Sequence, residues 1–200
     1  MTPRQRKAAS EILLKDKGIA FDPTLPPIEA DFPARSVEEI ARRAMCLTLV
    51  ALKAEGMGAP QVAEFAREHA LGPKTLTPSE QRFLAALPSD EDADWVWRFE
   101  ALHVLLWALG YLVELGWPNC ESNSAEELEF LRELGPQGFL EGALLRSNEQ
   151  LLDAADWVYR LHQSVVDERA GTESVVEEVV EQWSHALDWL TREEEDWESS

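Results

Sequence analysis

A glutamate and a histidine on one predicted helix are the residues best placed for chemistry in this sequence. Glu100 and His103 stand three positions apart, so their side chains share a helix face with Cβ atoms about 5–6 Å apart. This Glu-x-x-His spacing occurs in di-iron bundle proteins, which also need a second such unit and two further glutamates on facing helices. The sequence has no second unit, and nothing in the spacing favours a single-metal site that adds His162 or His185. We therefore expect no metal and no cofactor.

Glu100 lies among aromatic residues of the same helical pattern, namely Trp97, Phe99 and Trp107. Burying a carboxylate in such surroundings is costly unless the carboxylate is paired. We therefore expect a buried ion pair with an arginine of the same helix or a neighbouring one. The candidate arginines are Arg98, Arg160, Arg43 and Arg146. On this interpretation Glu100 has a structural role.

A ligand pocket is the alternative interpretation, because a carboxylate held among aromatic rings is a typical site of a perturbed pKa. The side chains that would line this pocket are Arg98, Glu100, His103, Trp107, Arg160 and His162. Asp156 and Arg160 stand four positions apart, which ordinarily gives an ion pair on the surface of a helix. No Ser, Cys or Thr lies in a nucleophile motif, and no glycine-rich phosphate loop is present. We therefore expect no catalytic residue, and the sequence favours a non-enzymatic protein.

The charge of the chain is strongly negative and unevenly distributed. The formal net charge is −20, and residues 101–200 carry 22 acidic but only five basic residues. Such a surface repels nucleic-acid backbones and anionic lipid headgroups, so we expect neither nucleic acid nor membrane as a partner. It attracts a basic protein surface, with fast and salt-sensitive association. The alternative is that the acidity only keeps the protein soluble.

The acidic end of the chain is the candidate partner-binding segment. Residues 192–200 form an acidic tail, within which we expect the contact residues to be Glu193, Glu194, Glu195, Asp196 and Trp197. A partly exposed Trp197 among these charges would anchor an interface with a basic partner, because tryptophan is frequent at interface anchors. The alternative is a frayed, solvated tail.

Cysteine usage and apolar run lengths indicate a cytoplasmic protein. Cys46 and Cys120 have no Cys-x-x-Cys partner, which fits a reducing compartment. The first residues lack an apolar segment long enough for a secretory signal. The longest apolar run, 101–117, is interrupted by His103 and Glu114 and falls short of the roughly 20 residues that cross a bilayer. We therefore predict a buried helix there.

Helix start and stop signals divide the chain into predicted helices and connections. A first helix over 4–17 is stopped by Gly18, and prolines make residues 19–34 an extended connection. Ser or Thr followed three residues later by Glu or Gln predicts later helix starts, and such starts lie at Ser36, Thr77, Ser124, Ser147 and Ser174. Proline predicts one more helix start, at Pro60.

These signals predict an all-α protein, since no convincing run with a two-residue period is present. We expect residues 1–200 to form a single compact domain, because a chain of this length suits one shared core. The predicted architecture is an orthogonal bundle of about seven to nine helices. A central apolar helix from Trp95 to Gly116 forms its core. The oligomeric state stays open.

Short motifs along nearly the whole chain occur in the same order as in the sequence pattern of one known family. They are Lys17-Gly18-Ile19, the Arg-Ser-x-Glu-Glu-Ile start at 35–40, the Trp-x-x-Glu helix ending in Leu-Trp-Ala-Leu-Gly at 97–110, Arg146-Ser147, the 156–160 segment, 186–190 and Asp196-Trp197. In these motifs the chain resembles the bacterial family of domains of unknown function numbered 4272. It departs from the pattern at residues 182–185, where a basic segment is expected. The resemblance implies no activity, substrate or catalytic residue.

Three functional hypotheses follow. The favoured one is a non-enzymatic interaction module that binds a basic partner, in the style of an immunity or inhibitor protein. The second is a small-molecule-binding or enzymatic domain with its pocket around Arg98, Glu100, His103 and Trp107. The third is a structural helical module within a larger assembly, which would need no pocket.

Overall fold

The structure is a computed structural model that describes residues 1–29, 35–87, 89–192 and 196–198, without the side chains of residues 90–92, 129 and 132. The helices in these ranges are α1 (Pro3–Asp16), α2 (Val37–Ala54), α3 (Ala59–Glu68), α4 (Pro78–Ala85), α5 (Arg98–Ala108), α6 (Ser124–Glu141), α7 (Asn148–Val166) and α8 (Glu177–Thr191), with 3₁₀-helices η1 (Asp90–Trp95) and η2 (Thr172–Ser174). The same ranges contain no strand, so the predicted all-α class is confirmed. None of these helices is both long and apolar enough to cross a membrane.

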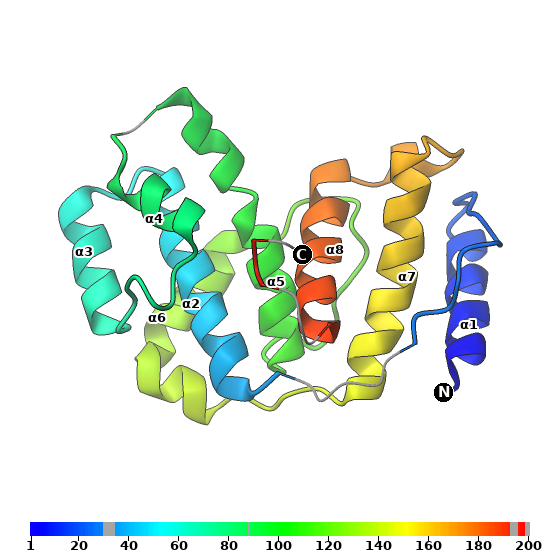
Figure 1. Cartoon of the computed structure of the whole chain (residues 1–200), viewed down its shortest axis with the longest axis horizontal. Helices are drawn as coiled ribbons and strands as arrows, with labels where there is room; N and C mark the ends of the chain where they lie inside the picture. The colour runs from blue at the N-terminus through cyan, green and yellow to red at the C-terminus, as the bar shows by residue number, and fades with distance from the viewer. Residues whose placement is uncertain (30–34, 88, 193–195, 199–200) are drawn as a thin grey trace.

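The predicted central apolar helix is confirmed as α5. It packs against α2 on one side and α8 on the other (Figure 1). Every residue of α5 except Arg98 and His103 is buried. A helix that is apolar nearly all round belongs inside a core, and α5 accordingly lies at the centre of the larger hydrophobic cluster. The two exceptions are two of the side chains that the sequence analysis selected as candidates for chemistry.

Five helices follow one another in a row along the longest dimension of the molecule. Figure 1 shows the order α2, α5, α8, α7 and α1, in which each helix packs against the next. α3, α4 and α6 pack around α2 at one end of this row. At the other end a second, smaller cluster holds α1 against α7 and α8, and its buried members are Leu14, Ile19, Leu161, Val165 and Val180.

The central helix ends earlier than predicted. The sequence suggested a helix as far as Gly116, but α5 stops at Ala108. Gly110 has φ of +82°, and a Cβ there would lie 2.5 Å from the backbone oxygen of Leu144. Only glycine combines this left-handed backbone with such a close approach. The chain therefore turns at Gly110, and residues 111–123 form a non-helical segment beside α5.

Three of the predicted capping signals are confirmed. Ser36, Thr77 and Ser147 each form a complete capping box with the Glu or Gln three residues later. Ser174 does not cap α8, because it lies in η2 and α8 begins after Val176 without a side-chain cap. Ser124 is the first residue of α6, whose N-cap is Asn123.

The Asp156–Arg160 pair is buried, which corrects the predicted surface pair. Both side chains have no exposed area, and Arg160 Nε donates to Asp156 Oδ2 at 2.9 Å. Arg160 also donates to the carbonyl of Pro26 at 2.9 Å, and Asp156 accepts the amide of Ile28 at 3.2 Å. The pair therefore fixes the described part of the proline-rich connection, residues 19–29, against α7.

Candidate functional site

The Glu100–His103 unit lies in a buried polar cluster that joins α5 to α6 and to the segment before it. His103 Nδ1 lies 2.5 Å from Glu127 Oε1, and His103 Nε2 lies 3.1 Å from the carbonyl oxygen of Leu115. A neutral imidazole donates from only one nitrogen, whereas both nitrogens of His103 face an oxygen. The geometry thus favours the imidazolium form, in which both nitrogens donate. Burial disfavours that charge, but the hydrogen bond and the negative charge of Glu127 outweigh burial and raise the pKa of His103.

The carboxylate of Glu100 is held by neutral donors. It accepts the backbone N–H of Ser122 at 2.7 Å and the indole N–H of Trp183 at 3.3 Å. Burial raises its pKa, and the hydrogen bonds from Ser122 and Trp183 oppose this effect. The predicted arginine partner is wrong, because no ion pair of Glu100 is present in the described part of the chain.

The four arginines that were candidates for Glu100 all bind elsewhere. Arg43 pairs with Glu80, and Arg160 pairs with Asp156. Arg146 donates to the carbonyl oxygens of residues 107, 112 and 113. Arg98 donates to Gln182 Oε1 at 3.2 Å. These arginines bind other acids, carbonyls or amides, and the charge that is shown to act on the pKa of Glu100 is that of His103, which lowers it.

The predicted pocket residues separate into several environments. Arg98 lies over Trp95, with 5.6 Å from its guanidinium carbon to the ring centroid, and burial lowers its pKa. Trp107 lies beneath Arg146 and lines a cavity of about 620 Å³ between α1, α7 and residues 114–117. His162 Nδ1 lies 3.4 Å from Ser184 Oγ. Of the six candidates, the structure thus brings only Glu100 and His103 into one cluster.

The Glu100–His103 cluster is suited to holding a proton rather than transferring one. Both ring nitrogens of His103 are used, and its ring stacks on Trp183 with 5.6 Å between centroids. Neither nitrogen has a free lone pair that could act as a general base. In the described ranges no group of three or more His, Cys, Asp or Glu side chains is arranged to hold a metal ion.

The predicted partner-binding tail is described only in part. Glu193, Glu194 and Glu195 lie outside the described residues, and Asp196 is exposed. The expected exposure of Trp197 is wrong, because its side chain is only 6% exposed. Its ring packs edge-on against Trp189 at 5.3 Å and against His185 at 4.4 Å. This aromatic packing removes Trp197 from solvent.

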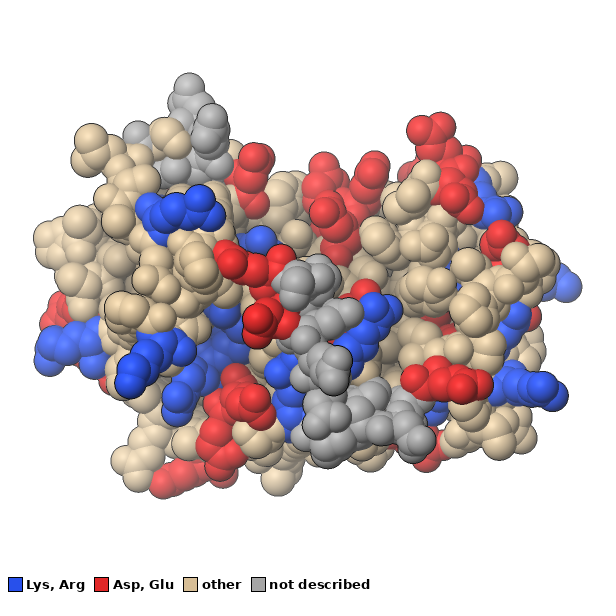
Figure 2. Space-filling model, in the orientation of Figure 1, with Lys and Arg blue, Asp and Glu red and all other residues tan. Residues whose placement is uncertain are grey.

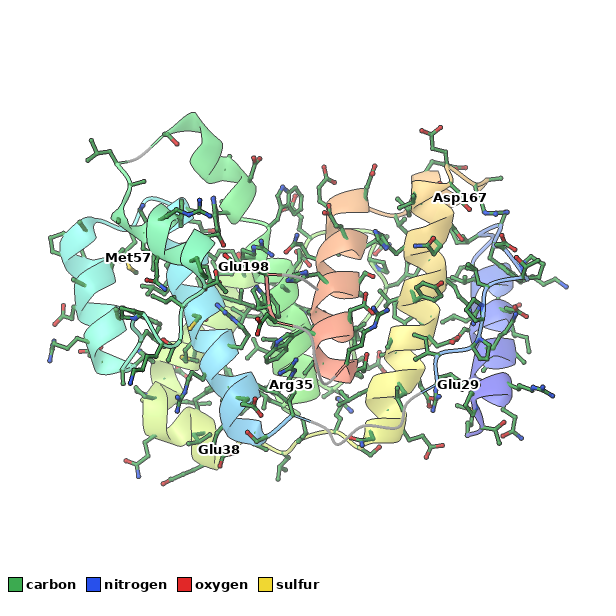
Figure 3. The ribbon with its side chains drawn as sticks, in the orientation of Figure 1. Glu29, Arg35, Glu38, Met57, Asp167 and Glu198 are labelled. Atoms are coloured by element: carbon green, nitrogen blue, oxygen red, sulfur yellow. The ribbon has the colours of Figure 1, made fainter. Side chains whose placement is uncertain are left out.

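A groove that sequence reasoning missed lies between α2, α3 and α6. It has a volume of about 880 Å³. Its apolar floor consists of Met45, Leu52, Met57, Phe65, Leu128 and Leu131. Exposed Glu55, Glu64 and Glu68 stand at its rim, and none of its lining residues is Lys or Arg. Met57 is labelled between α2 and α3 in Figure 3.

Local contacts give this groove a defined wall. The ring of His69 stacks on Phe65 with 3.9 Å between centroids, and His69 Nδ1 lies 2.9 Å from the carbonyl oxygen of Phe65. On the opposite side α6 bends at Gly135, which has φ of +61° and precedes Pro136. Both residues line the groove. A half-buried Phe65 on a short helix, where Val62 already provides the buried contact, is a signal in the sequence that could have indicated this surface.

A comparison with family models matches nearly the whole chain to one family. A family model described as "Domain of unknown function (DUF4272)" matches residues 6–200. Neither a search of curated proteins nor a search of solved structures found a match.

Proposed function

Since the chain belongs to the DUF4272 family, whose description assigns no activity, we propose a function from the geometry of the molecule: it is a non-enzymatic interaction protein that binds a basic partner. The groove between α2, α3 and α6 is the docking site. One observation carries the proposal, namely an apolar floor under a rim that bears three glutamates and no lining cation.

The chemistry of this groove suits an amphipathic basic helix. Such a helix places its apolar face in a hydrophobic groove through residues three or four positions apart. Met57, Phe65 and Leu128 are half-buried, so each offers apolar surface that an incoming side chain could cover. Lysines or arginines on the flanks of the helix would then meet Glu55, Glu64 and Glu68.

The floor and the rim contribute differently to binding. Burying one leucine-sized side chain is worth about 1.5–3 kcal/mol, whereas an exposed ion pair is worth about 0–1 kcal/mol. Exposed Arg67 already lies 3.8 Å from Glu64 and further weakens the contribution of that glutamate. The floor therefore supplies most of the affinity, while the rim sets orientation, association rate and salt dependence.

A synthetic amphipathic leucine-lysine peptide tests this function. We expect saturable binding, measured by fluorescence anisotropy of the labelled peptide, and weaker binding at high salt. A peptide of the same composition in a non-amphipathic order should bind at least about tenfold more weakly. Equal binding of the two peptides would contradict the proposal, because charge alone would then explain the association.

Substitutions in the protein test whether the peptide binds in the groove. Met57→Asp should reduce affinity for the amphipathic peptide about tenfold or more, since Met57 lies on the groove floor but is not part of the buried core. Val113→Asp introduces the same charge at an apolar residue that is 88% exposed outside the groove, and it is the matched control. If both variants bind the peptide as the wild type does, the groove is not the docking site.

A further inference from the structure

A further cavity brings several cations of this acidic molecule together. It is a cleft of about 660 Å³ between the start of α2, residues 74–78 and residues 196–198, and its lining also includes the acids Glu39, Asp196 and Glu198. Four cations line it, namely Arg35, Arg42, Arg43 and Lys74. In a chain with 18 basic residues and a net charge of −20, this is a pronounced concentration of positive charge. Figure 2 shows Lys and Arg side chains on this face around α2.

Residues 196–198 line this basic cleft. Glu198 Oε1 accepts the backbone N–H of Ser79 at 2.6 Å, in the first turn of α4. Hydrogen bonds from Ser79 lower the pKa of Glu198. The ring of Trp197 lies between Trp189 and the guanidinium of Arg43, with 5.1 Å from Arg43 Cζ to the ring centroid. Glu198 and Arg35 are labelled in Figure 3, where Glu198 lies beside α4.

Two buried donors in the cleft are not used by the described residues. Arg43 is 6% exposed, and its Nη2 binds Glu80, but its Nε has no hydrogen-bond partner in the described ranges. The indole Nε1 of Trp197 is likewise without one there. A buried donor without an acceptor is unfavourable. Of the two, only Arg43 Nε belongs to the wall of the cleft, which therefore offers one unused donor to a bound oxygen atom; the indole belongs to the 196–198 segment.

The acids that face the cleft are largely committed to helix caps. Glu39 accepts the amide of Ser36, and Glu80 accepts the amide of Thr77 in addition to its pair with Arg43. The remaining acids that line the cleft are Asp196 and Glu198, both from the end of the chain. Glu39 and Glu80 thus already pair with Arg35 and Arg43, and Asp196 and Glu198 add two further acids to the lining of the cleft.

We infer that this cleft is a binding site for acidic peptide segments with a tryptophan between their acids, and that residues 196–198 occupy it as an intramolecular ligand. Glu198 accepts the N–H of Ser79, both acids line the cleft together with its cations, and the tryptophan packs on Trp189 and Arg43. The same cations could hold a free phosphate, but a phosphate would not use the aromatic contacts. This inference concerns a different surface from the groove and does not rest on the proposed function.

Competition between the chain and a free copy of its own end tests the inference. The probe is a labelled synthetic peptide of residues 192–200, and the readout is its fluorescence anisotropy. The full-length protein with Trp197→Ala and Glu198→Gln should bind the peptide at least about tenfold more tightly than wild type does, because the tethered segment of the wild type competes at a high effective concentration. Equal binding to both proteins would overturn the inference.

Three further arms make the result specific. Adding Lys74→Glu to the double variant should abolish peptide binding, and a peptide with Trp197→Ala should not compete. Displacement of the labelled peptide by inorganic phosphate as readily as by unlabelled peptide would show an anion site only and overturn the inference.

A second variant covers the case in which the double variant does not fold. The full-length protein with Asp196→Asn and Glu198→Gln keeps the tryptophan packing, and its affinity for the peptide should still be higher than that of the wild type. Glu178→Gln, an exposed substitution on α8, is the matched control.

Discussion

The surroundings of His103 favour its positively charged form inside the molecule, because an oxygen faces each of its nitrogens. One of these oxygens belongs to Glu127 in α6, and the other is the carbonyl of Leu115. The ring therefore connects α5, α6 and the non-helical segment 111–123 through a single proton-dependent contact. Loss of that proton would leave one of the two oxygens without a donor in a buried site, which is costly.

Replacing His103 tests the charge at this site. The pKa of His103 is raised in the folded protein, so its contribution to the free energy of unfolding is fully present below the unfolded pKa of about 6.5 and is lost as the pH rises through the folded pKa. We expect the difference in stability between wild type and His103→Gln to shrink as the pH increases above about 6.5. Urea unfolding at a series of pH values measures this difference.

Glu127→Gln provides the companion measurement. It removes the negative charge that raises the pKa of His103, so the decline in stability above neutral pH should begin at a lower pH in this variant. A stability difference between wild type and His103→Gln that is the same at every pH would contradict the assigned charge.

At the residue scale, the sequence predicted either the burial of a side chain or its partner, but not both. The aromatic pattern correctly placed Glu100 in the core, where it is 3% exposed. Its partner Ser122 could not be found, because the amide of Ser122 belongs to a non-helical segment without periodicity. For Asp156 and Arg160 the spacing gave the correct pair but not its burial. The proline-rich segment that covers the pair comes from a distant part of the sequence.

The end of α5 shows how a single backbone position sets the length of an element. The apolar run continues beyond Ala108, so periodicity alone favours a longer helix. Gly110 turns the chain instead, and the backbone of Leu144 passes close to it, with the Leu144 N–H donating to Leu109 at 2.9 Å. The turn thereby frees residues 111–123 to supply the Leu115 and Ser122 contacts of the Glu100–His103 cluster.

Gly110→Ala should therefore destabilise the fold by more than backbone strain alone. The new Cβ would lie 2.5 Å from the Leu144 oxygen, in addition to the cost of about 1–2 kcal/mol for a left-handed backbone at a non-glycine residue. Gly116→Ala is the matched control, since Gly116 has φ of +86° but a Cβ added there would have no neighbouring atom within 4 Å. Urea unfolding of both variants separates the two effects. Equal destabilisation would show that the approach of Leu144 is unimportant.

Helix starts were predictable where the signal is local. At Ser36, Thr77 and Ser147 the cap depends on residues within one turn, and the sequence identifies each of them. Ser174 carries the same signal but fails, because the amide of Val176 donates to the carbonyl of Pro118 at 2.8 Å. This tertiary contact fixes extended backbone at Val176, so α8 begins after it.

On the scale of the whole molecule, charge is separated into surfaces of opposite sign. Exposed Glu177, Glu178 and Glu181 lie at the start of α8, where Figure 2 shows acidic side chains along the upper edge. The basic cleft lies between the start of α2, residues 74–78 and residues 196–198. The sequence revealed the excess of acidic residues in 101–200, but it did not reveal the groove or the basic cleft. Each cavity is assembled from three segments that only the tertiary fold brings together.

The arrangement of the helices in a row also implies that the molecule does not unfold as one cooperative unit. α1 lies at the end of the row, is held mainly by α7 and shares only the smaller hydrophobic cluster, whereas α5 is enclosed on both sides. Amide hydrogens of α1 should exchange with deuterium through a local opening that leaves α5 protected. Arg6→Gln, which removes the 2.8 Å contact of Arg6 with Asp153, should speed exchange in α1 and leave α5 unchanged. Identical protection of α1 and α5 in both proteins would instead show that the molecule is a single cooperative unit. In that case α1 could not unfold without the rest of the fold.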